Sequence, residues 1–145
     1  MNPVWIILFA PLCAAAIITL LTRKSQALSS LISCAAILTG FVLTMQLFLQ
    51  HGNWTLPEPL KWLVVDNIVK IEFGATVDRL SILMLLVVTG VGSAIHIYSL
   101  GYMKGDPGFS RFFACLSLFT FSMLGIVLSN NFIQIFIFWE LVGVS

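Results

Sequence analysis

Long apolar runs separated by short polar stretches make up most of the chain. Residues 3–22, 28–49, 79–100 and 111–129 carry almost no charge. A helix of about 20 such residues is long enough to cross the hydrocarbon core of a bilayer. A fifth apolar run occupies residues 131–145. The pattern predicts an all-α polytopic membrane protein with about five transmembrane helices, the last of them incomplete.

One stretch between the second and third runs has a different periodicity. Apolar and polar residues alternate on both sides of Asp66-Asn67, a pair suited to a two-residue turn, so we predict a β-hairpin over about residues 60–73. One register would give an apolar face and place Lys61 opposite Glu72, a favourable cross-strand pair. The predicted pairs are Val65–Ile68, Val64–Val69, Leu63–Lys70, Trp62–Ile71, Lys61–Glu72 and Leu60–Phe73.

Composition and charge place the chain in a membrane and orient it. The sequence is 59% hydrophobic and 9% charged, against about 25% charged in soluble domains. Its net charge of +1 gives no indication of a nucleic-acid partner. The loops after the first and third runs carry Arg23, Lys24, Lys104 and Arg111. The excess of positive residues predicts that these loops are cytoplasmic, with the N-terminus and the hairpin outside.

The residue types that hold metals and redox cofactors are sparse and badly spaced. Cys13, Cys34 and Cys115 lie inside apolar runs, without metal-ligand or disulfide spacing. We expect them to be small buried apolar residues. The sequence has no glycine-rich phosphate loop, no paired-cysteine motif and no haem or flavin signature. We therefore expect no metal, no redox centre and no soluble small-molecule substrate in this chain.

Glu140 is the strongest candidate for chemistry, because it follows a run of isoleucine, phenylalanine and tryptophan. If its helix begins at Asn131, nine residues of about 1.5 Å rise place Glu140 about 13 Å into the membrane, near the midplane. A charge at that depth costs roughly 2.5–3.5 kcal/mol, so such residues usually act in ion or proton pathways. The alternative is a protonated glutamic acid that only joins helices.

Two further polar residues each admit two interpretations. His96, near the inner end of the third run, is either structural or a second site of proton exchange, since histidine titrates near neutral pH. Asp78, at the start of that run, is either a helix N-cap or a member of a polar network with a neighbouring subunit.

Several segments resemble one family of membrane subunits. FWELVGVS at residues 138–145 is similar to the fifth-span motif of the largest antiporter-like subunit of respiratory complex I, called subunit L or NADH dehydrogenase subunit 5. HIYSLGYM at residues 96–103, SRFFA at 110–114 and VLSNN at 127–131 resemble its third and fourth spans. The resemblance extends over essentially all of residues 1–145, which would form the N-terminal part of an antiporter-like domain.

The resemblance implies a role for the chain and for Glu140. The family's subunit contributes to a proton path driven by quinone reduction elsewhere in NADH:quinone oxidoreductase. Glu140 would pair with a lysine of a later span, and a change in their separation would alter the proton affinity of both groups. NADH, FMN, iron–sulfur clusters and quinone would bind to other subunits. The partners would be other membrane subunits of complex I and the lipid bilayer.

Length and chemistry leave other interpretations open. The family's subunit is several times longer, and residues 131–145 fall short of the roughly 20 needed to cross a membrane, so we expect an N-terminal fragment. One carboxylate serves protons or sodium ions, which leaves an Mrp-type cation/proton antiporter subunit as one alternative. A non-transporting scaffold or assembly protein, complete at 145 residues, is the other.

Overall fold

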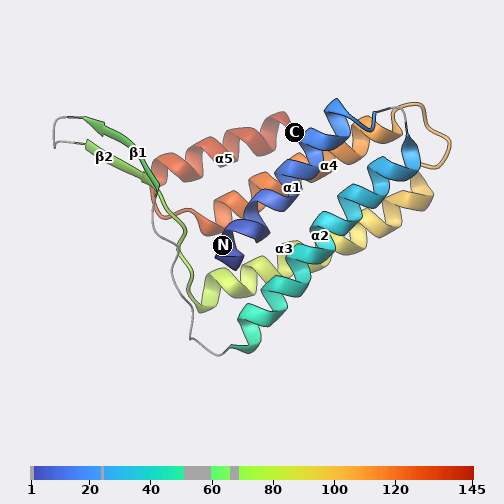
Figure 1. Ribbon diagram of the computed structural model, residues 1–145. Coiled ribbons are helices and arrows are strands. Elements are labelled where there is room, and N and C mark those ends of the chain that lie inside the picture. Colours follow the sequence, from blue (N-terminus) through green and yellow to red (C-terminus); the bar gives the residue numbers. More distant parts are fainter. Residues whose placement is uncertain (1, 24, 51–59, 66–68) are drawn as a thin grey trace.

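The computed structural model describes residues 2–23, 25–50, 60–65 and 69–145. Within these residues the helices run back and forth, so that each is antiparallel to the next (Figure 1). Their bounds are α1 Pro3–Leu20, α2 Gln26–Leu49, α3 Arg79–Tyr102, α4 Phe109–Leu128 and α5 Phe132–Val144. The first four are long and apolar enough to cross a membrane, whereas α5 is a shorter apolar helix of 13 residues.

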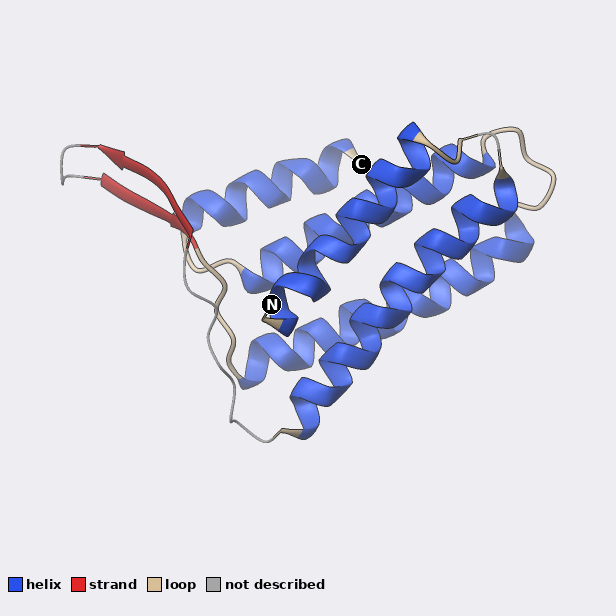
Figure 2. Cartoon of the chain, viewed as in Figure 1, coloured by secondary structure: helices blue, strands red, loops and turns tan. Residues whose placement is uncertain are grey.

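Between α2 and α3 the described backbone forms two antiparallel strands, β1 Leu60–Val65 and β2 Val69–Phe73, which project from one end of the bundle (Figure 2). Leu60 faces Phe73 and Lys61 faces Glu72, as predicted. Towards the tip the predicted register is wrong by one residue, because Leu63 pairs with Ile71 and Val65 with Val69. Three residues separate the strands instead of two, and an irregularity between Lys61 and Leu63 absorbs the difference. The predicted turn, Asp66-Asn67, lies outside the described residues.

Helices α1, α3 and α5 each begin at a side chain that accepts a hydrogen bond from a backbone N–H of the first turn. The Asn2 side chain accepts from the Val4 N–H at 3.1 Å, and Pro3 occupies the first helical position. Asp78 accepts from the Ser81 N–H at 2.6 Å, which confirms its interpretation as an N-cap. The hydrogen bond from Ser81 lowers the pKa of the Asp78 carboxyl from its ordinary value.

Helix α4 is the centre of the bundle, since α1, α2, α3 and α5 all pack against it. Apolar side chains gather in two clusters, one towards each end. The cluster at the hairpin end contains Val4, Ile7, Leu8, Leu47, Ala75, Val77, Ile82, Leu85, Phe121, Leu124, Leu128 and Phe138. The cluster at the other end contains Ile18, Cys34, Phe109, Phe113 and Ala114.

The segment that follows β2 closes the hairpin end of the bundle. Ala75 forms an isolated antiparallel bridge with Ser129, and the Thr76 N–H donates to the Leu128 carbonyl oxygen at 2.8 Å. Ala75 and Val77 are buried. These contacts attach the entrance of α3 to the turn that leads into α5, and so they fix where α5 begins.

Candidate functional site

Glu140 lies on the side of α5 that faces away from the bundle. In α5 only Gln134 and Phe138 are buried, and their spacing of four residues puts them on one face. Glu140 follows Phe138 by two residues, which is a rotation of about 200° around the helix. Its side chain is accordingly exposed, beside the exposed Trp139.

The direction of Glu140 is set by the way α5 packs on α4. The Phe138 ring meets the Phe121 ring edge-on, with centroids 5.4 Å apart. It also lies directly over Gly125, where any Cβ atom would collide with the ring. Only glycine admits this close approach, so the buried face of α5 is fixed and Glu140 is held outward.

Among the described residues Glu140 has no hydrogen-bond or ion-pair partner. A carboxylate near the centre of a bilayer without a polar neighbour is costly, by roughly 2.5–3.5 kcal/mol. A polar or cationic group from outside this bundle would remove that cost. The outer face of α5 is therefore the place where a partner of the predicted acid would have to lie.

Gln134 is a buried polar residue that the sequence analysis did not single out. Its side chain is 4% exposed, and its Nε2 donates to the Gly74 carbonyl oxygen at 3.1 Å. Its Oε1 has no partner among the described residues. An unsatisfied buried group of this kind costs about 1–3 kcal/mol. A polar side chain six residues before Glu140, within an apolar run, was the available signal.

His96 is buried in the interior of the bundle, at 1% exposure. Its Nδ1 lies 2.7 Å from the Gly92 carbonyl oxygen. A carbonyl oxygen only accepts, so Nδ1 carries a proton and Nε2 is left as the acceptor of the neutral ring. The imidazole also borders a cavity of about 210 Å³ between α3 and α4, whose walls are apolar except for His96 and Thr120.

The structure does not bring His96 and Glu140 together. The cavity beside His96 touches α4 at Leu116, Thr120 and Met123. Helix α5 packs on α4 at Phe121 and Gly125. With 3.6 residues per turn, these two sets of positions lie on roughly opposite sides of α4. The two predicted residues therefore belong to separate environments.

Hydroxyl groups join α2 to α4, and the sequence analysis did not single out these serines. Ser33 Oγ lies 2.6 Å from Ser117 Oγ, and both residues are buried. Ser29 Oγ lies 3.1 Å from Ser110 Oγ. The signal was present as serines spaced at four and seven residues on the two helices. In a membrane such pairs add directional contacts between helices.

No group of three potential metal ligands occurs in the part of the chain that the structure describes. Cys34 is buried and Cys115 is half-buried. The expectation of a buried side chain is wrong for Cys13, which is exposed. It sits on the outer face of α1, while the next two residues, Ala14 and Ala15, face the bundle.

Comparison with known proteins identifies relatives along the chain. A family model described as NADH-Ubiquinone oxidoreductase (complex I), chain 5 N-terminus matches residues 62–113. A chloroplastic NAD(P)H-quinone oxidoreductase subunit 5 from Zygnema circumcarinatum is 43% identical over 149 residues, which cover 97% of this chain and 21% of that protein. NADH-quinone oxidoreductase subunit L from Mycobacterium tuberculosis (strain CDC 1551 / Oshkosh) is 37% identical over 97% of this chain and 23% of its own length.

Over nearly its whole length the chain is similar to members of the complex I chain 5 family. Together with the four long apolar helices, this makes it a multi-pass membrane protein. NAD(P)H-quinone oxidoreductase chain 5 from Synechocystis is 39% identical over 96% of the chain and 22% of its own length. The chain thus spans about a fifth of the length of the curated relatives that it matches.

The extent of the family match separates the two predicted site residues. Residues 62–113 include most of β1, all of β2 and α3, and the start of α4, and so they include His96. Helix α5 and Glu140 lie beyond the matched segment. The relatives align over nearly the whole chain, which extends the similarity to α5.

Proposed function

We propose that this chain forms part of a membrane subunit of a proton-translocating NADH:quinone oxidoreductase, in which Glu140 is a member of the proton path. The observation that carries the proposal is the position of Glu140 within a chain similar to that family. It is a carboxylate on an apolar helix, directed away from its own bundle and without a partner among the described residues.

Physical chemistry gives this arrangement a mechanism. A cationic side chain packed on the outer face of α5 would satisfy the carboxylate and be satisfied by it. If the distance between the two groups changed, the proton affinities of the carboxylate and of the cationic group would change in opposite directions. A conformational step driven by quinone reduction in other subunits could then load or release a proton. The carboxylate itself forms no covalent bond and needs no cofactor in this chain.

His96 has a different place in the proposal. It is buried, and its protonated Nδ1 is bound to the backbone of its own helix. That supports a structural role first, in which the imidazole packs against the Phe113 ring. The centroids of the two rings are 6.4 Å apart. Proton exchange would have to use Nε2 and reach it through the cavity beside α4.

The remaining parts of the proposal concern the surroundings of the chain. NADH, FMN, iron–sulfur clusters and quinone would bind to other subunits, and neighbouring membrane subunits of complex I would cover the exposed apolar faces. The N-terminus would lie outside, with Arg23, Lys104 and Arg111 on the cytoplasmic side. The relatives come from bacteria and from chloroplasts, so a bacterial inner membrane is a prediction that cell fractionation can check.

The test is the replacement Glu140→Gln in the full-length protein, which keeps the size and hydrogen bonding of the side chain but removes its titration. Sealed inverted membrane vesicles would be supplied with NADH, and proton uptake would be followed with a pH-sensitive dye at matched rates of NADH oxidation. We expect fewer protons translocated per NADH oxidised. The amount of assembled complex should stay the same.

The matched control is Glu140→Asp, which preserves a titratable carboxylate and should retain more translocation than Glu140→Gln. Normal proton translocation in Glu140→Gln would exclude the proposed role. Sodium-dependent antiport without NADH-linked activity would assign the chain to the Mrp-type antiporters instead. If Glu140→Gln is silent while Glu140→Leu loosens the complex, the carboxylate serves packing alone.

A further inference from the structure

At the end of the bundle opposite the hairpin, two arginines border one cavity between α1 and α4. Arg23 follows α1 and Arg111 lies in the first turn of α4. Both line a cavity of about 240 Å³, together with Thr19 and the buried Ser110. Among the described residues neither arginine has an ion-pair partner, and no acidic side chain lines the cavity.

This cationic cavity continues into an apolar groove of about 340 Å³. The two share Thr19, Ala114 and Cys115 as lining residues. The groove lies between α1 and α4, and it is hollow because several of its lining side chains are small, Ala15 and Ala16 among them. It reaches from Leu20 to Leu12, eight residues along α1, which is about 12 Å into the span.

We propose that this cavity and groove bind an anionic phospholipid, with the phosphate between Arg23 and Arg111 and one acyl chain along α1 and α4. Arginine presents several N–H donors in a planar fork that matches phosphate oxygens. The N-terminus of α4 adds the positive end of its helix dipole at the same place. Basic pockets between transmembrane helices on the cytoplasmic side are suited to anionic headgroups.

The apolar groove distinguishes a phospholipid from a free anion. A soluble phosphate would need only the arginines and Ser110, and it would gain nothing from a 340 Å³ groove that leads into the membrane. An acyl chain would fill that groove and would make the van der Waals contacts that the small lining residues cannot make with each other. Asp106 carries the nearest described carboxylate in the sequence, but it does not line the cavity, and its Oδ1 accepts from the Gly108 N–H at 2.6 Å. This inference makes no use of Glu140 and is independent of proton translocation.

The experiment uses the full-length protein in its native membrane complex and a phosphatidylglycerol whose acyl chain carries a photoactivatable diazirine. After illumination, labelled peptides are mapped by mass spectrometry. We expect labelling within α1 and α4 that excess phosphatidylglycerol suppresses and phosphatidylcholine does not. The double variant Arg23→Gln/Arg111→Gln should reduce this labelling by at least about ten-fold.

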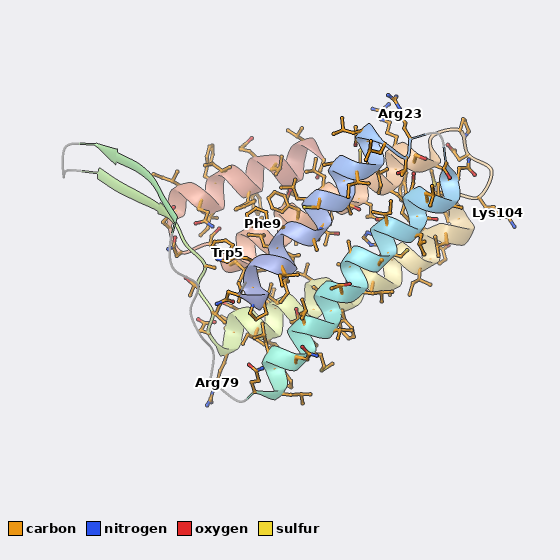
Figure 3. All side chains as sticks on the ribbon, viewed as in Figure 1. Trp5, Phe9, Arg23, Arg79 and Lys104 are labelled. Carbon is orange, nitrogen blue, oxygen red and sulfur yellow. The ribbon has the colours of Figure 1, made fainter. Side chains whose placement is uncertain are left out.

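Two controls separate the site from general surface charge. Figure 3 shows Lys104 at the same end of the bundle as Arg23 and Arg79 at the opposite end. Neither Lys104 nor Arg79 lines the cavity, so Lys104→Gln and Arg79→Gln should leave labelling of α1 and α4 unchanged. Equal loss in Lys104→Gln would overturn the proposal, because the effect would then be a general surface potential.

A third variant tests the groove without altering charge. Ala16 is exposed and lines the groove, so Ala16→Phe should fill it and lower labelling while both arginines remain. Displacement by inorganic phosphate with no effect of Ala16→Phe would show a soluble-anion site and refute phospholipid binding. Equal labelling by a phosphatidylcholine probe would show unselective lipid contact. Absence of labelling in the unaltered protein would refute phospholipid binding in the groove.

Discussion

Helices α4 and α5 are both apolar and adjacent in the sequence, yet they have opposite environments. Helix α4 packs against four other helices and buries eleven residues, most of them on one broad face. Helix α5 packs against α4 and buries only Gln134 and Phe138. The candidate proton carrier is on the second helix. The comparison teaches that α4 is packed on by the other described helices, whereas α5 leaves most of its surface, Glu140 included, uncovered by the described bundle.

The largest difference should come from removing an aromatic ring on each helix. Phe113 of α4 is fully buried and contacts the rings of Phe109, Phe112 and His96. Phe113→Ala would leave a cavity and should cost about 3 kcal/mol or more of unfolding free energy. Phe136→Ala on α5, at a side chain that is 57% exposed, should cost little in the isolated subunit. Reversible unfolding in detergent micelles measures both, and equal losses would contradict the contrast.

Glycine replacements test the interface between the two helices. A Cβ atom at Gly125 would collide with Phe138, so Gly125→Ala must push α5 away and should cost roughly 1–3 kcal/mol. At Gly143 a Cβ atom would have no neighbour within 4 Å in the described chain. Gly143→Ala should therefore be neutral or slightly stabilising, by up to about 1 kcal/mol. Unfolding curves of the two variants, recorded together, check the prediction; a harmless Gly125→Ala would show that α5 is loosely held.

A smaller effect is expected from the hydroxyl pair that joins α4 to α2. The double-mutant cycle of Ser33→Ala and Ser117→Ala should give a coupling energy of about 0.6 kcal/mol. Within the described part of the chain, Ser30 bonds only to carbonyl oxygens of its own helix. The cycle that pairs Ser30→Ala with Ser117→Ala should show no coupling. If both cycles gave the same value, the 2.6 Å contact between Ser33 and Ser117 would contribute no specific interaction.

These contrasts also show which features could be predicted from the sequence. The long spans follow from apolar runs of about 20 residues, because the bilayer admits little else. Helix starts follow from local chemistry, as at Asp78 and Asn131. The hairpin register failed near the tip because one extra residue between Val65 and Val69 shifts every pair up to the irregularity at Lys61 and Leu63. Alternation along a strand does not reveal a bulge.

The same reasoning could predict the key residue of the candidate site but not its surroundings. Glu140 can be singled out from the sequence because a carboxylate in an apolar run is costly to place in a membrane, and such residues are usually functional. Which way Glu140 points depends on the fit of Phe138 of α5 against Gly125 of α4. Both residues lie in apolar runs, where nothing in the sequence marks them as partners. Burial of Gln134 depends on the carbonyl of Gly74, sixty residues earlier in the chain. Such partners are set by packing, which leaves no local periodicity to find.

A pH-dependent difference is expected between the starts of α3 and α5. The cap of α3 is a carboxylate, whereas the cap of α5 is the neutral amide of Asn131, which accepts from the Gln134 N–H at 2.8 Å. The pKa of Asp78 is lowered in the folded protein by the Ser81 N–H. A lowered folded pKa means that its stabilisation is present above the ordinary pKa of 3.8 and is lost as the pH falls below it.

Thermal unfolding of Asp78→Asn at pH 7 and at pH 3 tests this difference. Asparagine still caps the helix but does not titrate, so the variant should lose less stability on acidification than the unaltered protein. Asp78→Ala removes the cap at both pH values and should lower stability at pH 7 itself. Asn131→Ala should cost about 1 kcal/mol, with the same value at either pH, because no titrating group is removed. An unchanged acid response in Asp78→Asn would mean that the charge on the cap has no role in stabilising α3. An acid-dependent loss in Asn131→Ala would mean that acid weakens helix starts without a titrating cap.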